Sequence, residues 1–147
     1  MKKILLILCL FAFACQNTLD KEIAKSKVTN VLELLKKHDF EKTKQYYDNS
    51  FNETESVEAR TKKFMDIESV AGKMISYEIQ GAYEQELDER NTLIINTRVI
   101  CEKTTLKEVF TIGKDEGEYK ILNHSVTNMG SDATGMPKTK VEAAPKK

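Results

Sequence analysis

The hydrophobic period of this chain changes at Gly72, from the spacing of helices to that of strands. Over 19–38 apolar residues recur every three or four positions, which predicts an amphipathic helix. These residues are Ala24, Val28, Val31, Leu32 and Leu35. From Ile75 to Tyr83 apolar and polar residues alternate, which predicts a half-buried strand. Because all the helical signals precede all the strand signals, the pattern indicates an α+β fold and not alternating α/β units.

Two further helices are expected before Gly72, over about 40–48 and 54–70. Asn52 and Glu55 have the spacing of a capping box at the start of the later helix. Three strands are expected after the first strand and its turn at 88–91, over 93–102, 106–112 and 119–127. The Gly-rich loop 113–117 is typical of a hairpin. The expected architecture is therefore three N-terminal helices packed on a four-stranded antiparallel meander.

The last expected strand has an ambiguous phase. Tyr119 and Ile121 alternate on one face, whereas Leu122, His124 and Val126 belong to the opposite phase. An extra residue in a strand produces such a change of phase, so a β-bulge is expected here.

The first fourteen residues have the pattern of an export signal. Lys2 and Lys3 precede an unbroken apolar run from Ile4 to Ala14. This run is shorter than the roughly 20 apolar residues that span a bilayer, and it ends in small residues of the kind a signal peptidase reads. We expect 1–14 to be a signal peptide, removed immediately before Cys15.

The stretch Phe11-Ala12-Phe13-Ala14-Cys15 resembles the bacterial lipobox. The resemblance implies lipidation of Cys15, membrane attachment through that lipid, and a tether over 15–20. Stable anchoring takes more than one acyl chain, and bacterial lipoproteins carry two or three. The residue after Cys15 is Gln16 and not the Asp that retains some lipoproteins at the inner membrane. This favours the outer membrane of the cell envelope. Cleavage at the same bond without lipid would instead give a soluble periplasmic or secreted protein.

Charge and cysteine content exclude several classes of function. Of the 23 Lys and Arg residues, Lys2 and Lys3 belong to the leader, so 21 basic residues face 23 acidic ones in the mature chain. No basic stripe appears, which argues against a nucleic-acid partner. After export and acylation Cys101 is the one free thiol, and its phase with Leu93, Ile95 and Val99 predicts a buried core residue. The segment 128–147 has no aromatic residue and is expected to be a disordered tail.

The segments 39–48, 109–112 and 118–121 carry a further resemblance. They read Asp-Phe-Glu-Lys-Thr-Lys-Gln-Tyr-Tyr-Asp, Val-Phe-Thr-Ile and Glu-Tyr-Lys-Ile. In their order they are similar to small bacterial lipoproteins with a nuclear-transport-factor-2-like (cystatin-like) domain, here spanning 21–127. The resemblance implies a curved sheet that wraps around a pocket, often in a dimer. It implies no function, because that fold carries both enzymes and binding proteins.

Two sets of residues are candidates for a site. Enzymes of that superfamily use an Asp–His pair in the pocket; here His124 is the candidate, with Arg98, Tyr77 and Tyr83 as possible neighbours. No carboxylate has a spacing that matches it to His124. The second set is Ile94, Ile100 and Val109, which share the opposite face of the sheet with Arg98 and form an apolar group of the kind that binds a protein partner or a second copy.

Nucleophile motifs, phosphate loops and metal-ligand spacings are absent from the sequence, so no metal and no cofactor are expected. The interpretation favoured is a non-catalytic, lipid-anchored protein that binds a ligand or a protein. The alternatives are a structural or assembly role through the sheet face, and a pocket enzyme that uses His124.

Overall fold

Residues 19–130 are described by the computed structural model of this chain. The helices are α1 (Lys21–Lys36), α2 (Phe40–Thr43), the 3-10 helix η1 (Lys44–Tyr46), α3 (Asn49–Thr54) and α4 (Val57–Ala71). The strands are β1 (Met74–Leu87), β2 (Arg90–Cys101), β3 (Thr105–Asp115) and β4 (Glu118–Asn128). The expected signal peptide 1–14, Cys15 and nearly all of the tether 15–20 lie outside the described residues, as does the expected tail from residue 131 onward.

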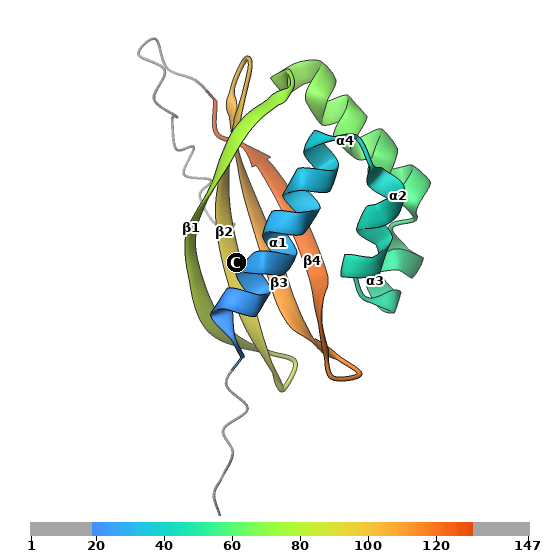
Figure 1. Ribbon diagram of the computed structural model, residues 1–147, viewed down its shortest axis with the longest axis vertical. Coiled ribbons are helices and arrows are strands. Elements are labelled where there is room, and N and C mark those ends of the chain that lie inside the picture. Colours follow the sequence, from blue (N-terminus) through green and yellow to red (C-terminus); the bar gives the residue numbers. More distant parts are fainter. Residues whose placement is uncertain (1–18, 131–147) are drawn as a thin grey trace, which may run out of the picture.

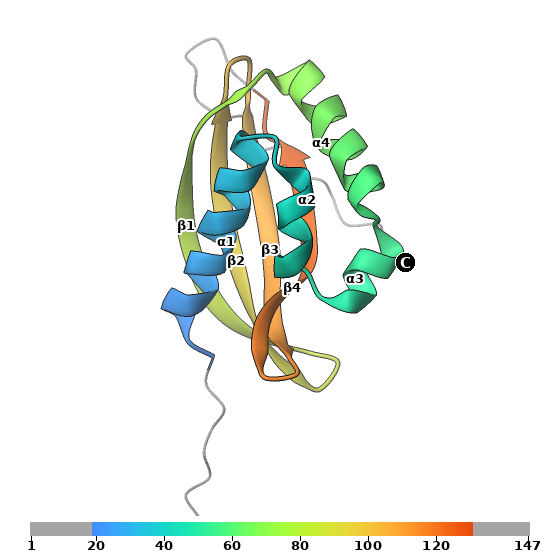
Figure 2. The same cartoon turned by 45° about the vertical axis from the view of Figure 1, so that its right-hand side comes forward.

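The four strands form one antiparallel sheet in the order β1-β2-β3-β4. Figures 1 and 2 show α1 lying across one face of this sheet, with α2 between α1 and α4. The α+β class, the N-terminal helices and the four-stranded meander are therefore confirmed.

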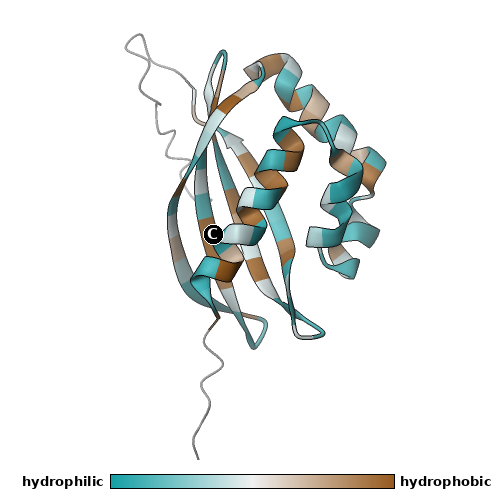
Figure 3. Ribbon diagram, viewed as in Figure 1, coloured by the Kyte–Doolittle hydropathy of each residue, from teal (hydrophilic) through white to brown (hydrophobic). Residues whose placement is uncertain are grey.

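Helix α1 follows its sequence pattern closely. The Asp20 side chain accepts hydrogen bonds from the backbone N–H groups of Glu22 and Ile23, which caps the helix. All five apolar residues of its expected inner face are buried, and Figure 3 shows hydrophobic bands along this helix. They pack into one core with Leu93, Ile95, Val99, Phe110, Ile112 and Ile121. Burying one aliphatic side chain contributes about 1.5–3 kcal/mol, so this face holds α1 on the sheet.

The single helix expected over 40–48 is replaced by α2, η1 and the start of α3. The backbone of Tyr47 is extended and forms an isolated parallel bridge with Ile121, and the N–H of Asp48 donates to the Ile121 carbonyl at 3.0 Å. This pairing with β4 interrupts the helix. Asp48 then caps α3 by accepting a hydrogen bond from the N–H of Phe51.

The capping box expected at Asn52 and Glu55 is also wrong. Ser56 caps α4 instead, accepting from the N–H of Ala59 at 3.2 Å. Asn52 lies inside α3, where its amide donates to the carbonyls of Lys44 and Tyr47. The Asn52 side chain, which the local pattern assigned to a helix cap, thus takes part in tertiary hydrogen bonds instead.

Register shifts decide which side chains share a face; β1 has two, the first between Met74 and Ser76, and β4 has one. In β1 the register shifts between Ile79 and Gly81, so Tyr77 faces the helices while Tyr83 lies on the outer face; the expectation that both share one face is wrong. In β4 the register shifts around Leu122, as the ambiguous phase predicted. Because of this shift His124 pairs with Phe110 and turns toward the helices.

Gly72 joins α4 to β1 in a conformation that other residues rarely adopt, with φ 79° and ψ 176°. A Cβ at this position would lie 2.7 Å from the Cβ of Glu102. We expect Gly72→Ala to lower the free energy of unfolding by about 2 kcal/mol, from backbone strain and the close contact. Urea denaturation measures this.

Gly81→Ala is the matched control. An added Cβ there meets nothing within 4 Å, and the backbone is not in the left-handed region. Its effect should stay within about 0.5 kcal/mol. Equal losses in the two variants would contradict the strain argument.

Candidate functional site

A buried chain of hydrogen bonds runs from Tyr47 through His124 to Glu108. Nε2 of His124 lies 2.9 Å from Oε2 of Glu108, and Nδ1 of His124 lies 2.8 Å from the Tyr47 hydroxyl. All three side chains are buried. An ionised carboxylate only accepts, so Nε2–H of His124 donates to Glu108, and the Tyr47 hydroxyl is free to donate to Nδ1.

Strand register brings the histidine and the carboxylate together. His124 on β4 pairs with Phe110 on β3, and Glu108 lies two residues from Phe110 on the same face. The imidazole stacks on Phe110 with 3.9 Å between ring centroids, and Phe64 of α4 lies 5.4 Å away. Both ring nitrogens and the ring faces of His124 are therefore engaged by the protein itself.

Arg60 holds the other end of this chain. Its guanidinium is fully buried and lies 3.9 Å from the centroid of the Tyr47 ring, a cation–π geometry. It donates to Oδ1 of Asn52 at 2.9 Å, to the carbonyl of Glu55 at 3.1 Å and to Oγ1 of Thr43 at 3.3 Å. Burial raises the pKa of the Tyr47 phenol far above its usual value, against an opposing effect of the Arg60 charge, so Tyr47 remains a donor.

One contact of this cluster is an ion pair without a hydrogen bond. Nε of Arg60 lies 3.4 Å from Oε1 of Glu55, yet neither atom has a hydrogen-bond partner among residues 19–130. The distance is short enough for charge compensation, but the N–H direction does not fit a hydrogen bond. The carboxylate therefore still compensates the buried guanidinium charge, which would otherwise be costly.

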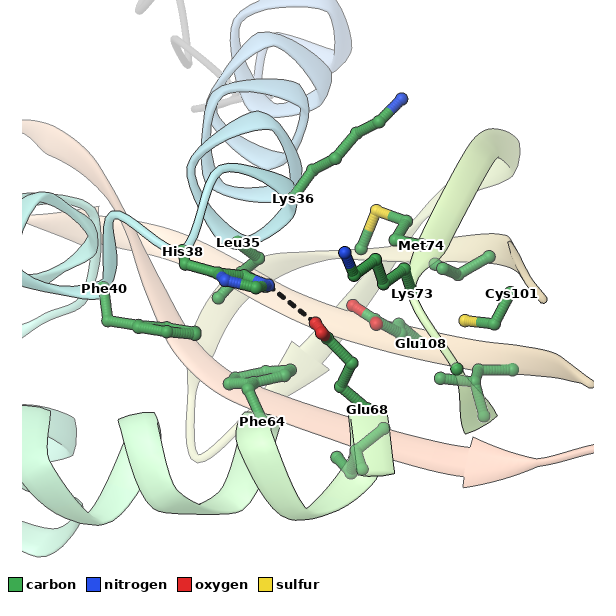
Figure 4. A pocket seen from close by; sticks show the side chains of 14 residues that line it. Leu35, Lys36, His38, Phe40, Phe64, Glu68, Lys73, Met74, Cys101 and Glu108 are labelled. Atoms are coloured by element: carbon green, nitrogen blue, oxygen red, sulfur yellow. Dashed lines mark hydrogen bonds and ion pairs between the residues drawn. The ribbon is translucent and has the colours of Figure 1, made fainter. Parts of the chain in front are cut away.

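A cavity of about 230 Å³ lies beside Glu108, between the end of α1, α4 and the sheet (Figure 4). Its apolar walls are Leu35, Phe40, Phe64, Ile67, Met74, Val99 and Leu106. The buried polar side chains that line it are Glu108 and Cys101. Such a concave, mostly apolar space with few polar groups is typical of small-molecule sites.

Exposed polar residues form the mouth of the cavity. His38 follows the C-terminal cap of α1 at a positive φ of 59°, and its Nε2 lies 2.7 Å from Oε2 of Glu68 on α4, the dashed contact in Figure 4. Lys36 and Lys73 also border the opening and are exposed. Lys36 points away from the cavity, since its Nζ donates to the carbonyl of Ile75 at 2.8 Å.

Cys101 is a buried core residue, as its phase predicted. Burial, together with the charges of Glu108 and Glu68, raises the pKa of its thiol to about 11. A thiol with so high a pKa stays protonated at neutral pH and is a poor nucleophile. Cys101 thus contributes a weakly polar wall to the cavity and no reactive group.

The other residues expected near His124 lie elsewhere. The Tyr77 hydroxyl donates to Oε1 of Glu33 on α1 at 2.7 Å, and partial burial together with Glu33 raises the pKa of this phenol to about 12. Tyr83 and Arg98 lie on the outer face, where Tyr83 pairs with Ile94 and Arg98 pairs with Glu78 and Lys107. None of the three comes into hydrogen-bond contact with His124.

The residues that build the site were not recognised in the sequence. Glu108 occupies the inward phase of its strand, between Leu106 and Phe110, and Arg60 occupies the inward phase of α4, between Val57 and Phe64. A charged residue at an apolar-phase position is the available signal, because such a group is rarely buried unless it is paired.

The outer face carries Ile94, Ile100 and Val109 together with Arg98, as the strand pattern predicted. Their exposure differs: Ile100 is 39% exposed, Val109 is half-buried and Ile94 is only 7% exposed. This apolar group is therefore less continuous than the alternation implied.

Neither a protein-family model nor a curated protein sequence matches this chain. Within residues 19–130, no group of three or more His, Cys, Asp or Glu side chains is arranged to hold a metal ion. No helix in this part of the chain has both the length and the apolar composition to span a bilayer.

We expect His124→Ala to lower the free energy of unfolding by about 3 kcal/mol. The substitution leaves the Glu108 carboxylate and the Tyr47 hydroxyl without their partner, at about 1–3 kcal/mol each where they stay dry, and it removes a ring packed on Phe110. Urea denaturation measures the loss. Ser125→Ala, at the exposed neighbouring position, should change stability by less than about 0.5 kcal/mol. A similarly small effect of His124→Ala would contradict the hydrogen-bond chain.

Proposed function

We propose that this chain is an exported bacterial lipoprotein, anchored through Cys15, whose domain binds a small ligand without transforming it. In this proposal the domain is of the nuclear-transport-factor-2-like type, with a curved sheet around the binding pocket, and it faces the cell envelope from the outer membrane. The observation that carries the binding function is the cavity beside Glu108, which combines apolar walls with a buried carboxylate.

The carboxylate supports binding because its burial is costly. Transferring a charged group into an apolar interior is unfavourable unless partners compensate it. His124 supplies one hydrogen bond, to Oε2, and the carboxylate of Glu108 accepts no other hydrogen bond within residues 19–130. A ligand in the cavity would supply the remaining hydrogen bonds to this carboxylate, which would give its otherwise unfavourable burial a function in binding.

Catalysis through His124 has less support in the geometry. His124 does not line the cavity, and its two ring nitrogens are bonded to Tyr47 and Glu108. General acid–base chemistry needs a donor and an acceptor within reach of the substrate. Of the hydrogen-bonded residues Tyr47, His124 and Glu108, only Glu108 lines the cavity. Assembly through the outer face rests on Ile100 and Val109, whose apolar surface is interrupted by the burial of Ile94.

The anchor is tested by the intact mass of the protein extracted from bacterial membranes. We expect cleavage before Cys15 with two or three acyl chains added, because the lipobox-like stretch ends at this residue. Cys15→Ala should abolish the added mass and release the protein from the membrane fraction. A mature protein of unmodified mass would contradict the anchor and leave a soluble exported protein.

Ligand binding is tested by a substitution that fills the cavity with a larger side chain from one of its walls. Ile67 of α4 lines the cavity, whereas Met65 on the same helix is exposed and does not. Small organic fragments should shift the NMR signals of Val99, Cys101 and Leu106 in the unmodified protein. Ile67→Trp should abolish these shifts, and Met65→Trp should retain them. Fragments that bind Ile67→Trp equally well, or no fragment binding at these positions, would contradict the proposal.

A further inference from the structure

The buried polar side chains on the cavity wall are both hydrogen-bond acceptors toward a ligand. Glu108 presents a carboxylate, and Cys101 presents a sulfur whose thiol is only a weak donor. The strong donors that border the cavity, His38, Lys36 and Lys73, are all exposed at its mouth. The interior therefore lacks strong side-chain donors, and a ligand has to bring its own.

The Glu108 carboxylate has unused capacity for such a donor. Two carboxylate oxygens accept about four hydrogen bonds, and this one accepts a single bond, from His124, among the described residues. Any hydrogen bond to an ionised carboxylate is about twice as strong as one between neutral groups, and a cationic donor adds a charge–charge attraction that a neutral donor lacks. In this buried position the attraction is stronger than at the surface, because water does not screen it fully.

The lysines at the mouth do not cancel this preference. Lys36 and Lys73 are exposed, so water and salt screen their charges, and the ammonium of Lys36 is bonded to the carbonyl of Ile75. Glu68, also at the mouth, adds a second carboxylate close to His38. A cation entering the cavity therefore passes a mouth of mixed charge and reaches a buried anion.

The apolar walls determine the size and polarity of the rest of the ligand. Phe40, Phe64, Ile67 and Leu106 surround the space beside Glu108. A volume of about 230 Å³ exceeds the roughly 150 Å³ of a cavity that holds benzene. The geometry points to a primary amine as the ligand class, with its ammonium on Glu108 and a compact hydrocarbon body between Phe40, Phe64 and the sheet. This inference rests on the proposed binding function and specifies the chemistry of the same cavity.

Three probes of one shape and different head groups test it: cyclohexylmethylamine, cyclohexylmethanol and cyclohexanecarboxylate. Titrations followed by NMR should show the amine binding at least about tenfold more tightly than the alcohol, because only the amine adds a charge–charge attraction to its hydrogen bond with Glu108. The carboxylate should bind least, because it would meet Glu108 with like charge. The shifted signals should again be those of Val99, Cys101 and Leu106.

Two variants that each remove one negative charge test whether the preference for the amine is due to Glu108. Glu108→Gln keeps the shape and a hydrogen bond to His124, and it should reduce amine affinity about tenfold while reducing alcohol affinity much less. Glu84→Gln, at an exposed position of β1 that does not line the cavity, should leave the amine-to-alcohol ratio intact. If Glu108→Gln does not fold, the ratio in the unmodified protein and its loss in Ile67→Trp remain decisive.

The outcomes of these experiments distinguish the amine ligand class from the broader proposal that the cavity binds a ligand. An alcohol or carboxylate that binds as tightly as the amine overturns the amine class while leaving a ligand-binding cavity. Amine binding that survives Glu108→Gln in a folded protein overturns the assigned contact. Failure of all three probes overturns the ligand class, and the fragment experiment with Ile67→Trp then decides whether the cavity binds ligands at all.

Discussion

The buried guanidinium of Arg60 and the hydrogen-bond chain beyond it connect the helices to the sheet. Arg60 donates to Thr43 of α2, to Asn52 of α3 and to the carbonyl of Glu55 at the end of α3, and it stacks on Tyr47. Tyr47 in turn reaches His124 on β4, which holds Glu108 on β3. A buried charged group is tolerated only when its partners are in place, so these contacts require the short helices to take one arrangement. They account for the break of the expected helix at Tyr47.

This network also separates the polar part of the core from the apolar part. Under α1 the buried contacts are aliphatic and aromatic, and the helix packs on β1, β2 and β4. Its hydrogen bonds to β1, from the Tyr77 hydroxyl to Glu33 and from Lys36 to the carbonyl of Ile75, lie at the edge of this apolar contact. Under α4 the contacts include an arginine, a histidine and a glutamate, each buried and each with a partner. Apolar residues of similar volume would often be at least as stable as such an ionic core. Its presence next to a cavity is the observation on which the proposed ligand binding rests.

Glu108 belongs to both the network and the cavity, and this position decides its chemistry. His124 fixes the carboxylate from one side and is itself fixed by Tyr47 and Phe110. The carboxylate is thus oriented by the protein itself, so binding of the proposed ligand would cost less side-chain ordering. The thiol of Cys101, kept protonated by its high pKa, leaves the carboxylate as the dominant polar group of the interior.

Local pattern alone determined the class of this fold. The change of period at Gly72, the inner face of α1 and the bulge in β4 were all legible in the sequence, because each depends on neighbouring residues in one element. The break at Tyr47, the cap at Ser56 and the outward turn of Tyr83 were decided by tertiary contacts or by a register shift, which local propensity does not encode. The same holds for the site: Glu108 and Arg60 stood at inward positions in the sequence, but only strand register and helix packing could show which partners make their burial possible.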